Sequence, residues 1–77
     1  MKNLVEYLAK ALVDRPDEVR VEEFEEDDGT IVFEVEVGED EVGKVIGRNG
    51  RTINALRTVI RASAVRHNRR VLVDVVD

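Results

Sequence analysis

The spacing of apolar residues predicts that the chain begins with an amphipathic helix. Apolar side chains recur every three or four residues from about 3 to 14, which is the period of a helix with one buried face. Pro16 is expected to end this helix, because proline disfavours helical backbone in the residue before it. Asn3 followed by Glu6 fits a capping box, so we expect Asn3 to be the N-cap.

A β-hairpin is predicted after this helix. Two segments rich in valine, phenylalanine and glutamate, over about 19–26 and 30–37, flank a turn with the sequence DDG. The second segment alternates cleanly between apolar and polar residues. In the first, the alternation slips between Val21 and Phe24, which predicts either a β-bulge or an exposed sheet edge.

Two helices and a last strand are predicted in the second half of the chain. Gly38 breaks the strand before it, and a short helix begins at one of the acids 39–41 and runs to about Ile46. The sequence GRNG separates it from a longer helix over about 51–67. A loop with the sequence HNRR then leads to a strand over 71–76.

The longer helix carries two apolar stripes. One stripe has the spacing of a core-facing surface and consists of Ile53, Leu56, Ile60 and Ala64. The other lies beside it and consists of Ala55, Val59 and Ala62. Packing against one sheet requires only the first stripe. The second is expected either to be covered by the N-terminal helix or to form a contact between two copies of the chain.

The order of these elements, α-β-β-α-α-β, defines the expected fold class as α+β. A pair of helices connects the second and third strands, and such a crossover is right-handed and makes the two strands parallel when they are neighbours. We therefore predict a mixed three-stranded sheet with three helices packed on one face. The length corresponds to a single domain over 1–77.

Composition argues against an enzyme or a metal site. The chain has no cysteine and one histidine, His67, which is expected to be a solvated or helix-capping residue. No acid pair, nucleophile–base set or metal cluster is visible in the basic half of the chain, where a site for anions would lie, so no catalytic residue, metal or cofactor is expected. Apolar runs are too short to span a membrane, and charged residues interrupt the first helix, unlike a signal peptide. A cytoplasmic protein is expected.

Charge is distributed very unevenly along the chain. Residues 1–42 hold four lysines and arginines against fifteen acids, a net charge of −11, whereas residues 43–77 hold eight against two, a net charge of +6. Such asymmetry is typical of a protein with an anionic partner on one face. A mixed, solvated surface with internal salt bridges would also account for the asymmetry. Charge alone does not distinguish these two interpretations, and the glycines of the basic half provide further evidence.

The glycine-rich stretch 43–53, GKVIGRNGRTI, favours the anionic partner. The segment GEDEVGK over 38–44 matches the front of a phosphate-binding loop, but it lacks the hydroxyl residue after Lys44 and contains three acids. Gly47 and Gly50 are better placed, because they lie between two helices with Arg48 and Asn49 between them. The start of the following helix adds free N–H groups and the positive end of the helix dipole.

The segment 45–53, VIGRNGRTI, resembles the signature I-G-x-x-G-x-x-I of KH domains. The order of elements resembles the type II arrangement found in bacteria, and the whole chain is similar to the small stand-alone KH proteins of the KhpA family. The resemblance implies a non-catalytic protein that binds single-stranded RNA. In such a protein the G-x-x-G loop clamps a stretch of about four nucleotides. It also implies RNA chaperoning or post-transcriptional regulation and a link to cell shape and division.

The same resemblance implies which residues bind RNA. The strand would lie against the loop and its flanks, with bases packing on aliphatic side chains and on the last strand over 71–73. The residues implied are Lys44, Val45, Ile46, Gly47, Arg48, Asn49, Gly50, Arg51, Thr52, Arg69 and Arg70, the last two in the variable loop. Arg51 and Thr52 would also cap the second helix of the pair.

The resemblance also bears on the second stripe of the long helix. KhpA-like proteins pair with themselves and with a larger KH protein of the KhpB/Jag type, so Ala55, Val59 and Ala62 are the expected dimer interface, with Val59 at its centre. An alternative function follows: the chain would be a dimerisation module that partners a KhpB/Jag-type protein, with RNA binding secondary.

Overall fold

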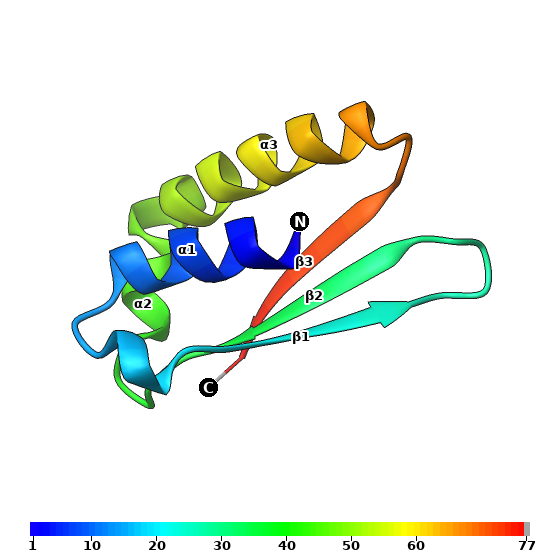
Figure 1. Cartoon of the computed structure of the whole chain (residues 1–77). Coiled ribbons are helices and arrows are strands. Elements are labelled where there is room, and N and C mark those ends of the chain that lie inside the picture. The colour runs from blue at the N-terminus through cyan, green and yellow to red at the C-terminus, as the bar shows by residue number, and fades with distance from the viewer. Residues whose placement is uncertain (77) are drawn as a thin grey trace.

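The computed structural model describes residues 1–76 and has three helices on one face of a three-stranded sheet (Figure 1). Two single turns of 3-10 helix, η1 and η2, accompany the main elements. The predicted α-β-β-α-α-β order and the α+β fold class are confirmed. In chain order the elements are α1 (Lys2–Leu12), η1 (Pro16–Glu18), β1 (Arg20–Glu25), β2 (Ile31–Glu36), α2 (Val42–Ile46), η2 (Arg48–Gly50), α3 (Arg51–Arg66) and β3 (Val71–Val76).

The sheet has the strand order β1-β2-β3, with β2 in the centre. Strands β1 and β2 form the predicted antiparallel hairpin, and β2 and β3 are parallel, as the helical crossover requires. The register of the hairpin is unbroken from the pair Arg20–Glu36 to the pair Glu25–Ile31, so the slip in alternation is not a bulge. The other prediction, an exposed sheet edge, explains the slip. Strand β1 is an edge strand in which Val21 is buried and Phe24 faces solvent.

The core lies between the sheet and the helices. The predicted stripe of α3 is buried at all four positions, against alternate residues of β2 and β3. Phe33 in the centre of the sheet and Ile60 on α3 are fully buried. Burial of a side chain of this size stabilises a fold by about 1.5–3 kcal/mol relative to leaving it exposed. The apolar pattern of the sequence therefore determines both the layer order and the face of α3 that packs inward.

Helix α1 begins two residues earlier than the capping pattern predicts, because the N-cap is Met1 rather than Asn3. Met1 is the N-cap, its carbonyl accepts a hydrogen bond from the Val5 N–H at 3.1 Å, and no side chain caps the helix. Asn3 lies exposed within the first turn, so the predicted capping box is wrong. This is the first regular backbone bond of the helix, and the N–H groups of the first turn before it have no side-chain cap.

Candidate nucleic-acid interface

The loop between α2 and α3, residues 47–50, is called here the glycine loop and has a backbone that ordinary residues adopt poorly. Gly47 has φ 76° and ψ 173°, a region that is essentially restricted to glycine. Asn49 and Gly50 follow in the left-handed region, with φ 56° and φ 75°. Glycine and asparagine are the residues that tolerate this conformation best. The spacing of the two glycines is thus a backbone requirement.

The two glycines have different surroundings. A Cβ atom on Gly47 would lie 2.8 Å from the backbone nitrogen of Thr52 and 2.6 Å from its Cβ, well inside contact distance. A Cβ atom on Gly50 would have no atom nearer than Asn54 Nδ2 at 3.8 Å. Gly47 therefore closes the loop onto the start of α3, whereas Gly50 leaves its backbone open to an approaching chain.

Positive charge surrounds this open backbone. The side chains of Arg48 and Arg51 are exposed, and no ion pair engages either of them within residues 1–76. Helix α3 begins at Arg51 with no side-chain cap, so the positive end of its dipole faces the loop. The consecutive residues 47–51 therefore combine an open backbone, two exposed guanidinium groups and a helix start, an arrangement suited to a phosphate backbone.

A buried carboxylate that the sequence did not reveal anchors α2, the helix that leads into this loop. Glu41 is fully buried, and its carboxylate accepts hydrogen bonds from the N–H groups of Asp14 at 2.6 Å and Arg15 at 3.1 Å. It also lies 3.6 Å from Arg15 Nε and 3.5 Å from Lys44 Nζ. One of the three acids expected to start the short helix thus ties α2 to the segment that follows α1.

Lys44 belongs to the same cluster. Its ammonium group donates a hydrogen bond to Asp14, and this bond raises the pKa of Lys44 above its ordinary value of 10.5. A group whose pKa is raised on folding contributes its stabilisation below that value and loses it as pH rises further, so the contact persists at neutral pH. A phosphate that uses Lys44 therefore competes with the carboxylate of Asp14.

Replacing Glu41 with glutamine tests the anchor. We expect Glu41→Gln to lower the free energy of unfolding by about 2 kcal/mol, because the two N–H groups donate to different carboxylate oxygens and the amide NH2 group would replace one of these acceptors with a donor. Urea denaturation followed by circular dichroism measures this, with Glu39→Gln as the matched control on an exposed neighbour. Equal stability of the two variants would contradict the anchoring role.

Two of the predicted contacts need correction. Val45 is fully buried in the core, so its side chain is not available to RNA. Helix α2 is five residues long, and Val45 is its buried residue, whereas the neighbouring Lys44 is exposed. Neither Arg51 nor Thr52 caps α3, because Gly50 is the N-cap and no side-chain bond is made there. Thr52 packs instead against Gly47.

The open edge of β3 differs from the predicted aliphatic wall. Val71 and Val73 are buried beneath the helices, so their side chains do not face the edge. The carbonyl of Arg70 accepts a bond from the Ile31 N–H at 2.9 Å, which turns alternate backbone groups of β3 toward β2 and leaves those of Val73 on the open side. At this edge β3 therefore offers polar backbone rather than aliphatic side chains.

Arg57 occupies this edge and was missed by the sequence reasoning. Its guanidinium donates from Nε at 3.2 Å and from Nη2 at 2.9 Å to the carbonyl of Val73. The available signal was its position on α3, directly after the buried Leu56, where a long basic side chain can cross from the helix to the neighbouring strand. Arg57 thereby places a cation between α3 and β3.

Arg69 and Arg70 are not brought to the glycine loop. They follow the C-terminal end of α3, and a helix of 16 residues separates them from the loop by about 24 Å. Arg69 is also engaged, because it pairs with Glu25 at 3.1 Å and donates to the Gly29 carbonyl at 3.2 Å. Contact of these two residues with RNA stays a prediction that requires a strand long enough to follow the whole of α3.

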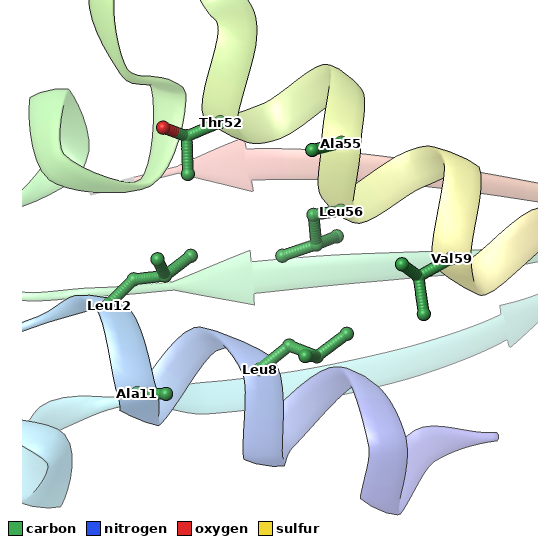
Figure 2. A pocket seen from close by; sticks show the side chains of 7 residues that line it. All are labelled: Leu8, Ala11, Leu12, Thr52, Ala55, Leu56 and Val59. Carbon is green, nitrogen blue, oxygen red and sulfur yellow. The ribbon is translucent and has the colours of Figure 1, made fainter.

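The second stripe of α3 lines an apolar groove. Figure 2 shows Val59 and Ala55 of α3 facing Leu8, Ala11 and Leu12 of α1 across it. Val59 remains 47% exposed, so α1 does not cover the stripe as one interpretation expected. Ala62 is also exposed but lies outside the lining of the groove. Of the two predictions made for this stripe, a contact between two copies of the chain therefore stays a prediction.

Two further findings limit the kinds of site present. Within residues 1–76, no group of three histidine, cysteine or acidic side chains is placed to hold a metal ion. In the same part of the chain, no helix combines the length and apolar character needed to cross a membrane.

His67 is the C-cap of α3, and its Nδ1 lies 2.9 Å from the carbonyl of Ser63, in agreement with a helix-capping role.

The order of elements, the parallel β2–β3 pair and the glycine loop between two helices define a KH domain of type II. Comparison with known proteins leads to the same class. Residues 2–75 match the family described as KhpA/KhpB, KH domain, and the chain belongs to this family. KH domains of this family are not enzymes.

Several curated relatives match along all or most of their length. The RNA-binding protein KhpA of Halalkalibacterium halodurans is 53% identical over 78 residues, covering 100% of both chains. The protein of the same name from Clostridium acetobutylicum is 49% identical over 76 residues, covering 99% of this chain and 100% of the relative. The RNA-binding protein KhpA of Borreliella burgdorferi is 43% identical over 74 residues, covering 96% of this chain and 89% of the relative. No solved structure matches the chain.

Proposed function

We propose that this chain is a non-catalytic protein that binds single-stranded RNA through the glycine loop. The observation that carries the proposal is the open backbone of Gly50, beside the uncapped start of α3 and the exposed guanidinium groups of Arg48 and Arg51. No carboxylate within residues 1–76 pairs with either guanidinium group. Relatives of the same length are named RNA-binding proteins, which supports it.

In this proposal the loop grips the RNA backbone, and the bases lie along the edge of β3 where Arg57 contacts Val73. Gly47 holds the loop against Thr52, Gly50 lets the sugar-phosphate chain approach, and Arg48 and Asn49 contact phosphates and sugars. Ile46 is half-buried at the end of α2 and offers an apolar surface to a base. The chain has three aromatic residues, none of them in α2, α3 or the glycine loop, so stacking on aromatics plays no part there.

The salt dependence of binding tests the proposal. If about three phosphates are neutralised, the logarithm of the affinity falls with the logarithm of salt concentration at a slope of roughly −2. Fluorescence anisotropy with a labelled 12-nucleotide single strand of RNA, from 50 to 200 mM potassium chloride, measures the slope. Binding that is absent, or equally tight to duplex RNA of the same length, would contradict a loop that grips single strands.

We further propose that the protein acts as a dimer through Ala55, Val59 and Ala62. The exposed Val59 and the apolar groove beside it support this, because a second copy would cover apolar surface that a small core leaves in water (Figure 2). By family resemblance, such a dimer would work in the cytoplasm in RNA chaperoning or post-transcriptional regulation, with a link to cell shape and division.

Val59→Asp is expected to give a folded monomer that still binds RNA, because a carboxylate at the centre of an apolar interface would be buried without a partner. Sedimentation equilibrium measures the association. Val65→Asp is the control, since Val65 is 76% exposed on the same helix and does not line the groove. A Val59→Asp protein that remains dimeric would place the interface elsewhere.

A second candidate function is a protein-interaction module that partners a larger KH protein of the KhpB/Jag type, with RNA binding secondary. The apolar groove between α1 and α3 favours it, since the groove would accept a similar helix from another KH domain. The Val59→Asp variant separates the two functions. RNA affinity that survives in the monomer supports direct RNA binding, whereas loss of both activities together supports the module.

A further inference from the structure

The face of the sheet turned away from the helices, called here the outer face, carries a row of apolar side chains. All three helices lie on the other side of the sheet (Figure 1). Strand pairing sets Phe24 opposite Val32, and Val32 opposite Leu72, so the three residues form one row across the strands. Phe24 and Leu72 are each 46% exposed, and no element within residues 1–76 covers this row.

A row of acids runs parallel to this apolar row. This row lies two residues away from the apolar row along each strand. Glu22 pairs with Glu34, and Glu34 pairs with Asp74, so three carboxylates lie side by side on the outer face. No salt bridge within residues 1–76 reaches any of the three. Like charges directly opposite one another on neighbouring strands destabilise a sheet. A partner that supplies cations to this row would relieve that repulsion.

The spacing of the two rows matches an α-helix. Strands lie about 4.8 Å apart, so three side chains in a row across the sheet span about 10 Å. Apolar residues at positions i, i+4 and i+7 of a helix span about 10.5 Å at a rise of 1.5 Å per residue. The acidic row lies about 6.6 Å from the apolar row, two residues along the strand. Lysine and arginine side chains on one flank of a helix are long enough to bridge that distance.

We propose that the outer face docks a basic amphipathic helix of a partner protein. The helix would lie across the strands, with its apolar stripe on Phe24, Val32 and Leu72 and lysines or arginines along one flank on the acidic row. Charge complementarity selects this occupant over a nucleic acid, which the carboxylates would repel. The face lies on the opposite side of the sheet from the helices that carry the glycine loop, so helix and RNA bind independently (Figure 1).

A synthetic peptide tests the proposal on the intact protein. The probe is a fluorescein-labelled 18-residue helix with leucines at i, i+4 and i+7 and lysines along one flank, and its affinity is measured by anisotropy. We expect the triple variant Glu22→Gln, Glu34→Gln, Asp74→Asn to bind it about tenfold more weakly, and Leu72→Ser to show a similar loss. A peptide with glutamates in place of the lysines should not bind.

A matched triple variant separates this face from general charge attraction. Asp17→Asn, Glu23→Gln, Glu39→Gln removes the same charge from exposed positions outside the two rows, and it should change peptide affinity by about twofold or less. An equal loss in both triple variants would overturn the proposal. Self-association of the protein that disappears only in the outer-face triple variant would assign the face to a second copy and would also overturn it.

Two readouts show that the outer-face variant is intact. Its urea midpoint should rise rather than fall, because neutralising the row removes repulsion within the sheet. Its affinity for single-stranded RNA should be unchanged or slightly higher, since the variant loses negative charge and keeps the glycine loop. Loss of RNA affinity together with peptide affinity would mean that the two sites are not independent, which contradicts the proposal.

Discussion

Replacing Gly47 with alanine is expected to lower the free energy of unfolding by about 3–5 kcal/mol. Two costs combine at this position: the backbone conformation is essentially restricted to glycine, at about 1–3 kcal/mol, and the added methyl group overpacks the start of α3, at a similar magnitude. The methyl group would meet the backbone nitrogen and Cβ of Thr52, which cannot move without shifting α3. A domain of this size has a small total stability, so much of the protein would be unfolded.

Two other glycines provide controls of graded effect. Gly50→Ala keeps space around the new atom but has φ 75°, so a loss of about 1–2 kcal/mol is expected. Gly43→Ala lies within α2 with open space around it, and helix propensity predicts a gain of about 0.5–1 kcal/mol. Urea denaturation of the three variants measures the order. A Gly47→Ala protein as stable as Gly43→Ala would show that the loop does not need this backbone.

The double variant Arg48→Asp, Asn49→Asp is expected to lose affinity for single-stranded RNA by about 100-fold or more. It removes one cation and places two anions where the proposal puts phosphates, and like charges brought together at an interface cost several kcal/mol. The fold should be unaffected. Both side chains are exposed, aspartate tolerates the left-handed backbone of Asn49, and acids are favourable near the start of α3.

The fold could be predicted from the sequence because its apolar pattern is regular. The stripe of Ile53, Leu56, Ile60 and Ala64 repeats with the helical period, and the alternation in β2 fixes which of its faces is buried. The residues at which helices and strands begin and end were harder to predict from the sequence. Helix α1 starts after Met1, with no side-chain cap, and the residue pattern around Asn3 suggested a start two residues later.

The glycine loop could also be predicted, but the contacts that support it could not. The need for glycine at position 47 follows from its place between two helices. Burial of Glu41 depends on the approach of the end of α1, 26 and 27 residues away in sequence. Arg57 likewise meets Val73 only once α3 lies against β3. Such pairings form through tertiary structure, and a single sequence carries no local sign of them.

The affinity of the double loop variant for single-stranded RNA tests the central claim most directly. The control is Asn3→Asp, Arg20→Asp, which makes the same two changes of residue type at exposed positions of α1 and β1, away from the loop. With both variants shown to be folded by circular dichroism, we expect anisotropy to show a loss of about 100-fold for the loop variant and about twofold or less for the control. Equal affinities of the two variants would contradict RNA binding by the glycine loop.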